Sequence, residues 1–305
     1  MFKPLLAPRE DPLSYPDYFK KLRYPLLCSP KLDGVRCIIK NGIALSRTGK
    51  AIPSFQVQND FNYLEGFDGE LIIGDKTAIN VFNKTQSHVM SRDKPGDLMF
   101  YIFDLTLENY LNASFEFRLN MAYRNLTTLY KDTPIEFRNA TVLEHILINN
   151  EEDLLAYELS CLHQGYEGIM LRDPNAYYKQ GRGTFNEGII YKLKRFKDDE
   201  GVIVDFEEQL QNFNEQTKDE LGYSKRSSHK ENMKAAGTLG KFILEFNGEI
   251  IEVAAGKFSH YERKLIWENQ EKYLGRLLKF RHFSYGVKDK PRFPRAIGFR
   301  DMIDI

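Results

Sequence analysis

Two Asn-Gly dipeptides, each set between runs of β-forming residues, constrain the fold of this chain more than any other feature. Asn41-Gly42 lies within a β-rich segment over 35–46, and Asn247-Gly248 lies within another over 241–253. An Asn-Gly pair readily adopts the positive φ angles of a two-residue hairpin turn. The sequence therefore predicts antiparallel hairpins near both ends of the chain.

Helical and β-type segments follow the first hairpin. The spacing of apolar residues predicts helices over 115–130 and 151–163, the second with Asn150 as its N-cap. Short β-type runs cover 67–73 and 98–104. These segments indicate a mixed α and β first domain.

The segment that follows residue 197 has a different character. A β-type run covers 201–206. A polar, charged stretch follows over 207–234, where we expect Lys225, Arg226, Lys230 and Lys234 to lie on a loop. Ser259-His260-Tyr261-Glu262 forms a capping box that opens a helix, which Gly275 can close. Short strands around one helix are typical of a small β-barrel of the oligonucleotide-binding (OB) type.

The chain has 305 residues, a length that favours two domains over one. Its change in character places the boundary near Phe196. We therefore expect a first domain over 1–196 and an OB-type domain over 197–305.

The composition excludes several classes of protein. No apolar run approaches the length of a membrane span, and the segment 1–8 is too short and too rich in proline for a signal peptide. Cys28, Cys37 and Cys161 are odd in number and lack CxxC spacing. A reducing, intracellular location without disulfides or structural zinc fits this pattern best.

The charges are unevenly distributed although the net charge is zero. The segment 272–300 carries nine basic residues and one acidic residue, a balance of +8. A second basic cluster contains Lys225, Arg226, Lys230 and Lys234. These segments favour a nucleic-acid-binding face, with an ordinary solvated surface as the alternative.

The run Lys31-Leu32-Asp33-Gly34-Val35-Arg36 places an amine, a carboxylate and a guanidinium within six residues. A lysine that attacks a phosphate must lose its proton, although its free pKa is about 10.4. Nearby positive charge must lower that pKa, and a bound metal must neutralise the phosphates. Arg36 can supply the charge, and Asp33 could hold the water shell of a metal. A surface turn is the alternative for this run taken alone.

Two carboxylates enter apolar strands. Glu70, in Asp68-Gly69-Glu70, is suited to a ribose hydroxyl or a metal, or belongs to a common turn. Glu167 is the better metal ligand, because hard divalent cations prefer carboxylate and water oxygens. Lys192 and Lys194 share one strand face, where an anion such as phosphate would offset their repulsion. The alternative is a solvent-facing edge strand.

Arginines and aromatic residues complete the candidate set. Arg47, in Ser46-Arg47-Thr48-Gly49, is either a phosphate ligand or a solvated strand end. Tyr101 or Phe103 could stack on a purine base, although buried aromatic residues more commonly belong to a core. The last apolar segment holds Arg292, Arg295 and Arg300.

Taken in order, these motifs resemble those of the ATP-dependent DNA ligases, within the covalent nucleotidyltransferase superfamily. The run that starts at Lys31 resembles the adenylylation motif of that family, and the others follow in the family's order. The likeness extends from Pro4 to Arg300. The compact length and the stretch over 219–229 look most like the short ligases of podovirus-type bacteriophages.

The resemblance implies an α+β fold, in which an adenylyltransferase domain of antiparallel sheets flanked by helices precedes an OB-fold barrel. It implies an enzyme that seals nicks in duplex DNA with ATP and Mg²⁺ through a lysyl-AMP intermediate, in replication, repair and recombination. The expected partner is nicked double-stranded DNA rather than a membrane. We also expect a monomer in the cytoplasm, that of a host bacterium if the chain is phage-encoded.

The resemblance further implies roles for single residues. The catalytic set is Lys31, Asp33, Lys192 and Lys194. The nucleotide-binding set is Lys31, Arg36, Arg47, Glu70, Phe103, Lys192, Lys194, Arg295 and Arg300. The metal-binding set is Glu167, Glu70 and Asp33. The DNA-binding set is Ser46, Arg47, Arg182, Lys225, Arg226 and Lys230.

Two alternatives stay open at this point. The first is an enzyme with the same lysine chemistry, either an mRNA capping guanylyltransferase or an RNA ligase, and the choice of base would separate these from a DNA ligase. The second is a non-catalytic nucleic-acid clamp with decayed motifs.

Overall fold

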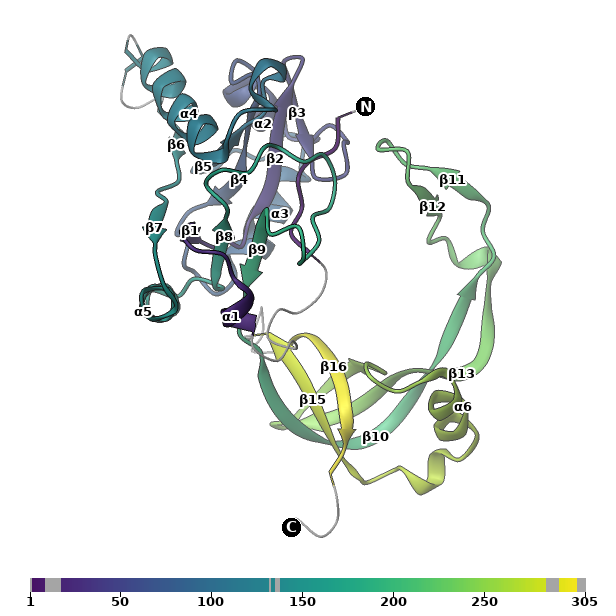
Figure 1. The fold of residues 1–305 in the computed structure, drawn as a ribbon. Helices are drawn as coiled ribbons and strands as arrows, with labels where there is room; N and C mark the ends of the chain where they lie inside the picture. Colours follow the sequence, from purple (N-terminus) through teal and green to yellow (C-terminus); the bar gives the residue numbers. More distant parts are fainter. Residues whose placement is uncertain (1, 9–17, 132, 135–137, 284–290, 301–305) are drawn as a thin grey trace. The chain divides into compact units, whose positions relative to one another are not determined.

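The computed structural model describes residues 2–8, 18–131, 133–134, 138–283 and 291–300 (Figure 1). The chain divides into one unit of Met1–Lys194 with Glu220–Gly222 and a second unit of Arg195–Asp219 with Tyr223–Ile305. Cys28, Cys37 and Cys161 are buried free thiols. Across the described part of the chain, no helix is long and apolar enough to cross a membrane.

A five-stranded sheet in the first unit grows from the predicted hairpin. Asn41 and Gly42 have φ angles of 53° and 69°, which are those of a tight hairpin turn. The strand order is β3-β2-β4-β5-β6. The strands are β2 (Val35–Lys40), β3 (Ile43–Ser46), β4 (Phe67–Ile73), β5 (Leu98–Leu105) and β6 (Ala140–Val142).

Alternation along these strands separates two cores. Leu71, Phe100 and Ile102 face a core shared with helices α2 (Phe55–Phe61) and α4 (Phe115–Leu129), which confirms the helix expected over 115–130. Ile72, Tyr101 and Phe103 face the opposite way and pack with residues of a second sheet. Helix α3 (Val81–Val89) also contributes to this second core through Val81.

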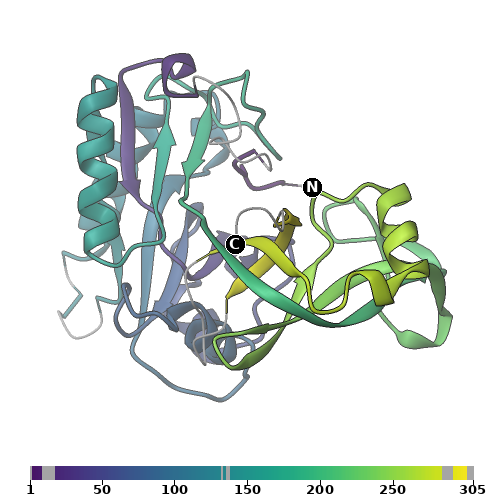
Figure 2. The ribbon, with the colours of Figure 1, turned by 90° about the horizontal axis from the view of Figure 1, so that it is seen from below.

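The second sheet has the order β7-β1-β8-β9 and follows helix α1 (Tyr18–Lys21) along the chain. Its strands are β1 (Leu26–Pro30), β7 (Ile146–Ile148), β8 (Ile169–Arg172) and β9 (Ile190–Leu193). Helix α5 (Glu151–His163), teal in Figure 2, runs along this sheet. Its N-cap is Asn150, whose side chain accepts a hydrogen bond from the backbone of Asp153, as the sequence predicted. In the first unit, α2 and α4 therefore pack on one face of the five-stranded sheet and the second sheet packs on its other face. Helix α5 packs on the second sheet.

The second unit is a barrel with the strand order β10-β13-β14-β16-β15, whose long curved strands are green to yellow in Figure 2. The strands are β10 (Lys197–Asn212), β13 (Met233–Phe246), β14 (Glu249–Ala254), β15 (Leu277–Phe283) and β16 (Arg292–Phe299). Helix α6 (His260–Glu268) opens with the predicted capping box of Ser259 and Glu262. Asn247 and Gly248 form the second hairpin turn, with φ angles of 51° and 78°.

Two expectations for this unit were wrong. The cluster of Lys225, Arg226, Lys230 and Lys234 does not lie on one loop. Lys225 and Arg226 belong to β12 (Ser224–Arg226), which pairs with β11 (Gln216–Lys218), and Lys234 belongs to β13. The side chains of β11 and β12 are exposed, so these strands have no apolar alternation that a sequence could reveal. Helix α6 ends at Glu268 rather than near Gly275, because a short 3₁₀ turn follows it.

Lys288 and Lys290 of the basic C-terminal segment lie outside the described residues.

Candidate active site

Lys31 lies in the loop that joins β1 to β2, and its backbone is fixed to the second sheet. Its N–H donates a hydrogen bond to the carbonyl of Gly168 over 2.8 Å. Gly34, in the same loop, is buried against β4, where an added Cβ would lie 2.2 Å from the carbonyl oxygen of Leu71. The glycine of this motif is therefore required by close packing, which holds the loop and its lysine against the sheet.

The carboxylate of Glu167 lies between two lysines. One of its oxygens forms an ion pair with Lys31 Nζ and the other with Lys194 Nζ. The Glu167 side chain is only 8% exposed. Three charged groups, two ammonium groups and one nearly buried carboxylate, therefore lie together in the first unit.

A glycine explains how Glu167 and Lys194 come together. Gly168 has a φ of 152°, and an added Cβ would lie 2.2 Å from the carbonyl oxygen of Leu193. Only glycine allows β8 and the end of β9 to approach so closely. Lys192 lies within β9, opposite Met170. Lys194 lies just beyond the last residue of that strand. Of the two lysines expected on one strand face, only Lys192 therefore lies within the strand.

Glu70 occupies the centre of a row that crosses three strands. Its Cα partners are Arg36 on β2 and Tyr101 on β5. Burial raises the pKa of Glu70 to about 7, although Arg36 and Lys31 act in the opposite direction. At neutral pH this carboxyl group is therefore divided between a hydrogen-bond donor form and an acceptor form.

Phe103 lies in a β-bulge of the same sheet. Asp68 faces Asp104 across β4 and β5, whereas the next residue, Gly69, faces Ile102, so Phe103 is left as the extra residue. Bulges re-aim side chains and are frequent next to active sites. The guanidinium carbon of Arg36 lies 4.5 Å from the centre of the Phe103 ring. Phe103 is thus presented differently from Tyr101, whose ring lies 5.4 Å from the ammonium of Lys76.

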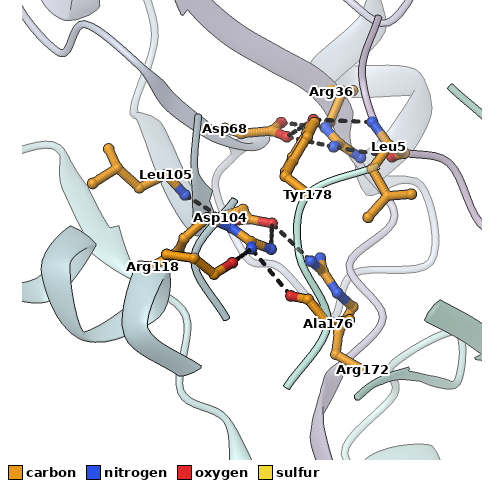
Figure 3. Close-up of polar contacts among 10 residues, drawn as sticks. Leu5, Arg36, Asp68, Asp104, Leu105, Arg118, Arg172, Ala176 and Tyr178 are labelled. Atoms are coloured by element: carbon orange, nitrogen blue, oxygen red, sulfur yellow. Dashed lines mark hydrogen bonds and ion pairs between the residues drawn. The ribbon is translucent and has the colours of Figure 1, made fainter. Parts of the chain in front are cut away.

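Asp68 binds Arg36 and was not singled out from the sequence. Arg36 Nε and Nη2 donate to the two carboxylate oxygens of Asp68 over 2.5 and 2.6 Å (Figure 3). Burial alone would lower the pKa of Arg36, but the attraction of Asp68 outweighs it and raises the pKa. The signal was available, because Asp68 stands two residues before Glu70 and so shares its sheet face.

A second buried ion cluster surrounds Asp104, at the end of β5. Arg118 Nε lies 2.8 Å from Asp104 Oδ1, and Arg172 Nη2 lies 2.7 Å from Oδ2 (Figure 3). Burial raises the pKa of Asp104, but Arg172 and Arg118 outweigh it and hold the pKa below its usual value. Asp104 therefore belongs to the internal framework rather than to a surface open to substrate.

The predicted metal ligands do not form a three-carboxylate cage. Among the described residues, no three His, Cys, Asp or Glu side chains gather as a metal site. Glu167 forms an ion pair with Lys31, while Lys31 and Asp33 act on Glu70 through their charges. This donor set still fits Mg²⁺, which usually takes one or two carboxylates and completes its shell with water and substrate phosphates.

The predicted DNA-binding residues of the first unit lie outside this cluster. Ser46 ends β3, and its hydroxyl lies 3.1 Å from that of Thr48. Arg47, the next residue, is exposed. Arg182 is also exposed, but its guanidinium donates to the carbonyl of Ala7 and helps to hold the N-terminal segment.

The remaining predicted residues belong to the second unit. Arg295 is exposed on β16, and Arg300 follows that strand and forms an ion pair with Glu200. Three more residues lie in the segment over 224–232. Lys225 and Arg226 are on β12, and Lys230 begins a 3₁₀ turn. Arg226 donates to the carbonyl of Asn214, so it also supports the local structure.

Comparison with known families agrees with this arrangement. Residues 4–194 match the family described as the ATP dependent DNA ligase domain, and residues 232–300 match the DNA ligase OB-like domain. The chain belongs to the ATP-dependent DNA ligase family. The expected family and the expected α+β fold with an OB-type second domain are thereby confirmed.

Individual relatives give the same picture. A DNA ligase of African swine fever virus (isolate Warthog/Namibia) is 25% identical over 139 residues, which are 46% of this chain and 31% of the relative. The chain thus spans about a third of the length of the curated relatives it matches.

Solved structures match over most of the chain. The Chlorella virus DNA ligase-adenylate is 29% identical, with a TM-score of 0.54 and coverage of 98% of this chain and 99% of that one. A Lig E DNA ligase is 21% identical, with a TM-score of 0.70 and coverage of 98% and 100%, and supports the fold alone. The finer likeness to podovirus-type ligases stays a prediction.

Proposed function

We propose that this chain is an ATP-dependent DNA ligase that seals nicks in duplex DNA. Residues 1–196 would form its adenylyltransferase domain and 197–305 its OB-type DNA-binding domain. The observation that carries the proposal is the pairing of Lys31 and Lys194 with the two oxygens of Glu167, in a member of this family. A nucleophilic amine, a second cation and a carboxylate are the groups that transfer of a nucleotide to lysine requires.

The proposed reaction has three phosphoryl transfers. Lys31 Nζ gives up a proton and attacks the α-phosphorus of ATP, and the bond to pyrophosphate breaks to leave lysyl-AMP. An oxygen of the 5′-phosphate at the nick then attacks that phosphorus, and the lysine amine leaves. Finally, the 3′-hydroxyl loses its proton and attacks the 5′-phosphate, which joins the strands and releases AMP.

Several side chains of the first unit would assist. Glu70 would bind a ribose hydroxyl, since its carboxyl group can donate or accept a hydrogen bond near neutral pH. Phe103, half-buried at its bulge, would stack on adenine. Lys192 and Lys194 would bind the α-phosphate. To do so, Lys194 would give up its ion pair with Glu167. Asp33 and Arg36, whose charges act on Glu70, would line the same site.

A divalent ion would complete the site. When bound, Mg²⁺ neutralises the phosphates and makes the α-phosphorus more electrophilic. Glu167 would hold it, with Glu70 and Asp33 close by. In our proposal this chain uses its own residues to orient the nucleotide, and the proton of Lys31, whose side chain is 23% exposed, passes to solvent water.

The DNA-facing roles rest on charge. Lys225, Arg226 and Lys230 would contact the backbone of the duplex, and so would Ser46, Arg47 and Arg182 of the first unit. Arg295 and Arg300 would orient the leaving pyrophosphate. We propose that the enzyme acts as a monomer in the cytoplasm, where its three buried thiols stay reduced.

Intact mass spectrometry tests the proposal directly. After incubation with ATP and Mg²⁺, the purified chain should gain the mass of one AMP group on Lys31, and nicked duplex DNA should then remove it and become sealed. Lys31→Ala should gain nothing, while the exposed-site control Lys84→Ala should behave as wild type. Labelling by GTP but not ATP would favour a capping guanylyltransferase, and failure to label with either would refute the lysine chemistry.

A further inference from the structure

The structure points to a role for the N-terminal segment and for a tyrosine remote in sequence. We propose that Tyr178 is a positioning residue for the adenine-stacking side chain Phe103, because its hydroxyl joins the backbone of Leu5 to Asp68, which holds Arg36 against the ring. This inference rests on the proposed function, since it assigns Phe103 to adenine.

Four residues form a closed ring of hydrogen bonds (Figure 3). Leu5 N–H donates to the hydroxyl of Tyr178 over 2.9 Å, and that hydroxyl donates to Asp68 Oδ2 over 3.2 Å. Asp68 accepts two hydrogen bonds from Arg36. Arg36 Nη2 closes the ring by donating to the carbonyl of Leu5 over 3.4 Å.

The ring is shielded from water. Leu5 is 1% exposed, Asp68 0% and Tyr178 4%, and the side chain of Arg36 is 17% exposed. In such a place, a donor or acceptor that loses its partner is not rescued by solvent and bears its full desolvation cost. Each member therefore has one favourable arrangement, and the position of Arg36 is set by the other three.

Arg36 transmits that position to Phe103. Its guanidinium covers one face of the ring, with the carbon atom 4.5 Å from the ring centre. A stacked base would then use the opposite face. Because Phe103 lies in a bulge, it has fewer ladder contacts to fix it than a regular strand residue. The guanidinium supplies the missing constraint.

The N-terminal segment adds further contacts to the same tyrosine. Phe2 stacks on Tyr178 with ring centres 5.6 Å apart, and the ammonium of Lys40 on β2 lies 4.7 Å from the Phe2 ring centre. Leu6 also donates to the carbonyl of Gly181 over 3.0 Å. The first residues of the chain are thus part of the framework behind the nucleotide site.

A purely structural role is the competing explanation. Tyr178 packs with Leu5, Ala176, Ile189 and Ile190, and a core residue of this kind would affect stability alone. The two explanations differ in their kinetic consequences. A positioning role raises the KM for ATP and leaves kcat nearly unchanged, whereas a structural role lowers the unfolding midpoint and leaves KM unchanged at temperatures where the protein is folded.

The test compares Tyr178→Phe with its neighbour Tyr177→Phe, since Tyr177 is 58% exposed. Steady-state sealing of nicked duplex DNA is measured over a range of ATP concentrations. Tyr178→Phe keeps the ring that packs in the core, and its KM for ATP should rise about five- to tenfold, as expected for one lost buried hydrogen bond, with kcat within about twofold. Tyr177→Phe should match wild type in both constants.

A double-mutant cycle with Phe103→Leu provides the second measurement. If Tyr178 acts through Phe103, the effect of Tyr178→Phe on KM should almost disappear in the Phe103→Leu background. An unchanged KM in Tyr178→Phe, or fully additive effects, would overturn the positioning role while adduct formation by wild type upheld the proposed function. The absence of an adduct in wild type and Tyr177→Phe would overturn both.

Discussion

Replacing Glu70 with Gln should stabilise the unliganded chain at pH 8 and weaken its reaction with ATP. Burial raises the pKa of Glu70 from 4.5 to about 7, and the attraction of Arg36 and Lys31 only partly opposes it. The ionised carboxylate is therefore a destabilising group in the folded chain. A neutral amide of nearly the same shape relieves that penalty but does not act as an ionised acceptor for a ribose hydroxyl.

The magnitude follows from the pKa. A rise from 4.5 to about 7 corresponds to about 3 kcal/mol. Because Glu70 is only partly buried by its neighbours, solvent reduces this to about 1–3 kcal/mol. The folded pKa exceeds the unfolded value, so the folded chain binds more protons between pH 4.5 and 7. Stability must therefore fall as the pH rises through that window and stay lower above it.

Urea unfolding from pH 5 to 8 without nucleotide measures the effect. Glu70→Gln should approach wild-type stability at low pH and exceed it by about 1–3 kcal/mol at pH 8. The control Glu108→Gln, at an exposed position, should show no such dependence. A difference that does not change with pH, or a less stable variant at pH 8, would refute the argument from burial.

Two other expectations test the framework and the DNA-binding surface. Asp104→Asn should lower the free energy of unfolding by about 3–5 kcal/mol at pH 7, measured with urea, because two buried arginines lose their counter-charge. Since the pKa of Asp104 is lowered on folding, its stabilising effect is present above the unfolded value of 3.8 and declines as the pH falls through the folded one. Lys225→Ala with Lys230→Ala should weaken binding to nicked DNA and reduce the slope of log K against log salt by about 0.9 for each DNA phosphate that the variant no longer neutralises. Binding that did not respond to salt would count against this surface.

Local signals in the sequence were reliable where one short segment determines its own conformation. Asn41-Gly42 adopts the turn that its positive φ angles allow, and Asn150 caps α5 with its own side chain. The polar strands β11 and β12 could not be foreseen in the same way. They are held by pairing with each other, and neither buries a side chain whose apolar character would mark it.

The candidate site was predictable as a set of residues but not as a set of pairs. The order of motifs singled out Lys31, Glu167 and Lys194, yet not that one carboxylate would bind both ammonium groups. Lys31 and Glu167 are 136 positions apart, and only the fold of two sheets decides that they meet. The requirement for glycine at position 168 could not be predicted either, because it comes from the backbone of Leu193 on another strand.

The pairing of Arg36 explains why Glu70 differs from an ordinary surface glutamate. By its strand register Arg36 stands beside Glu70, but its guanidinium is engaged by Asp68, two residues earlier on β4. Burial raises the pKa of Asp68 as well, but the charge of Arg36 and its two hydrogen bonds to this carboxylate oppose that rise directly. Glu70 is left with attraction too weak to offset its burial, and its pKa stays near 7. One arginine shared unequally between two carboxylates thus divides them into a structural acid and an acid that remains available to a ligand.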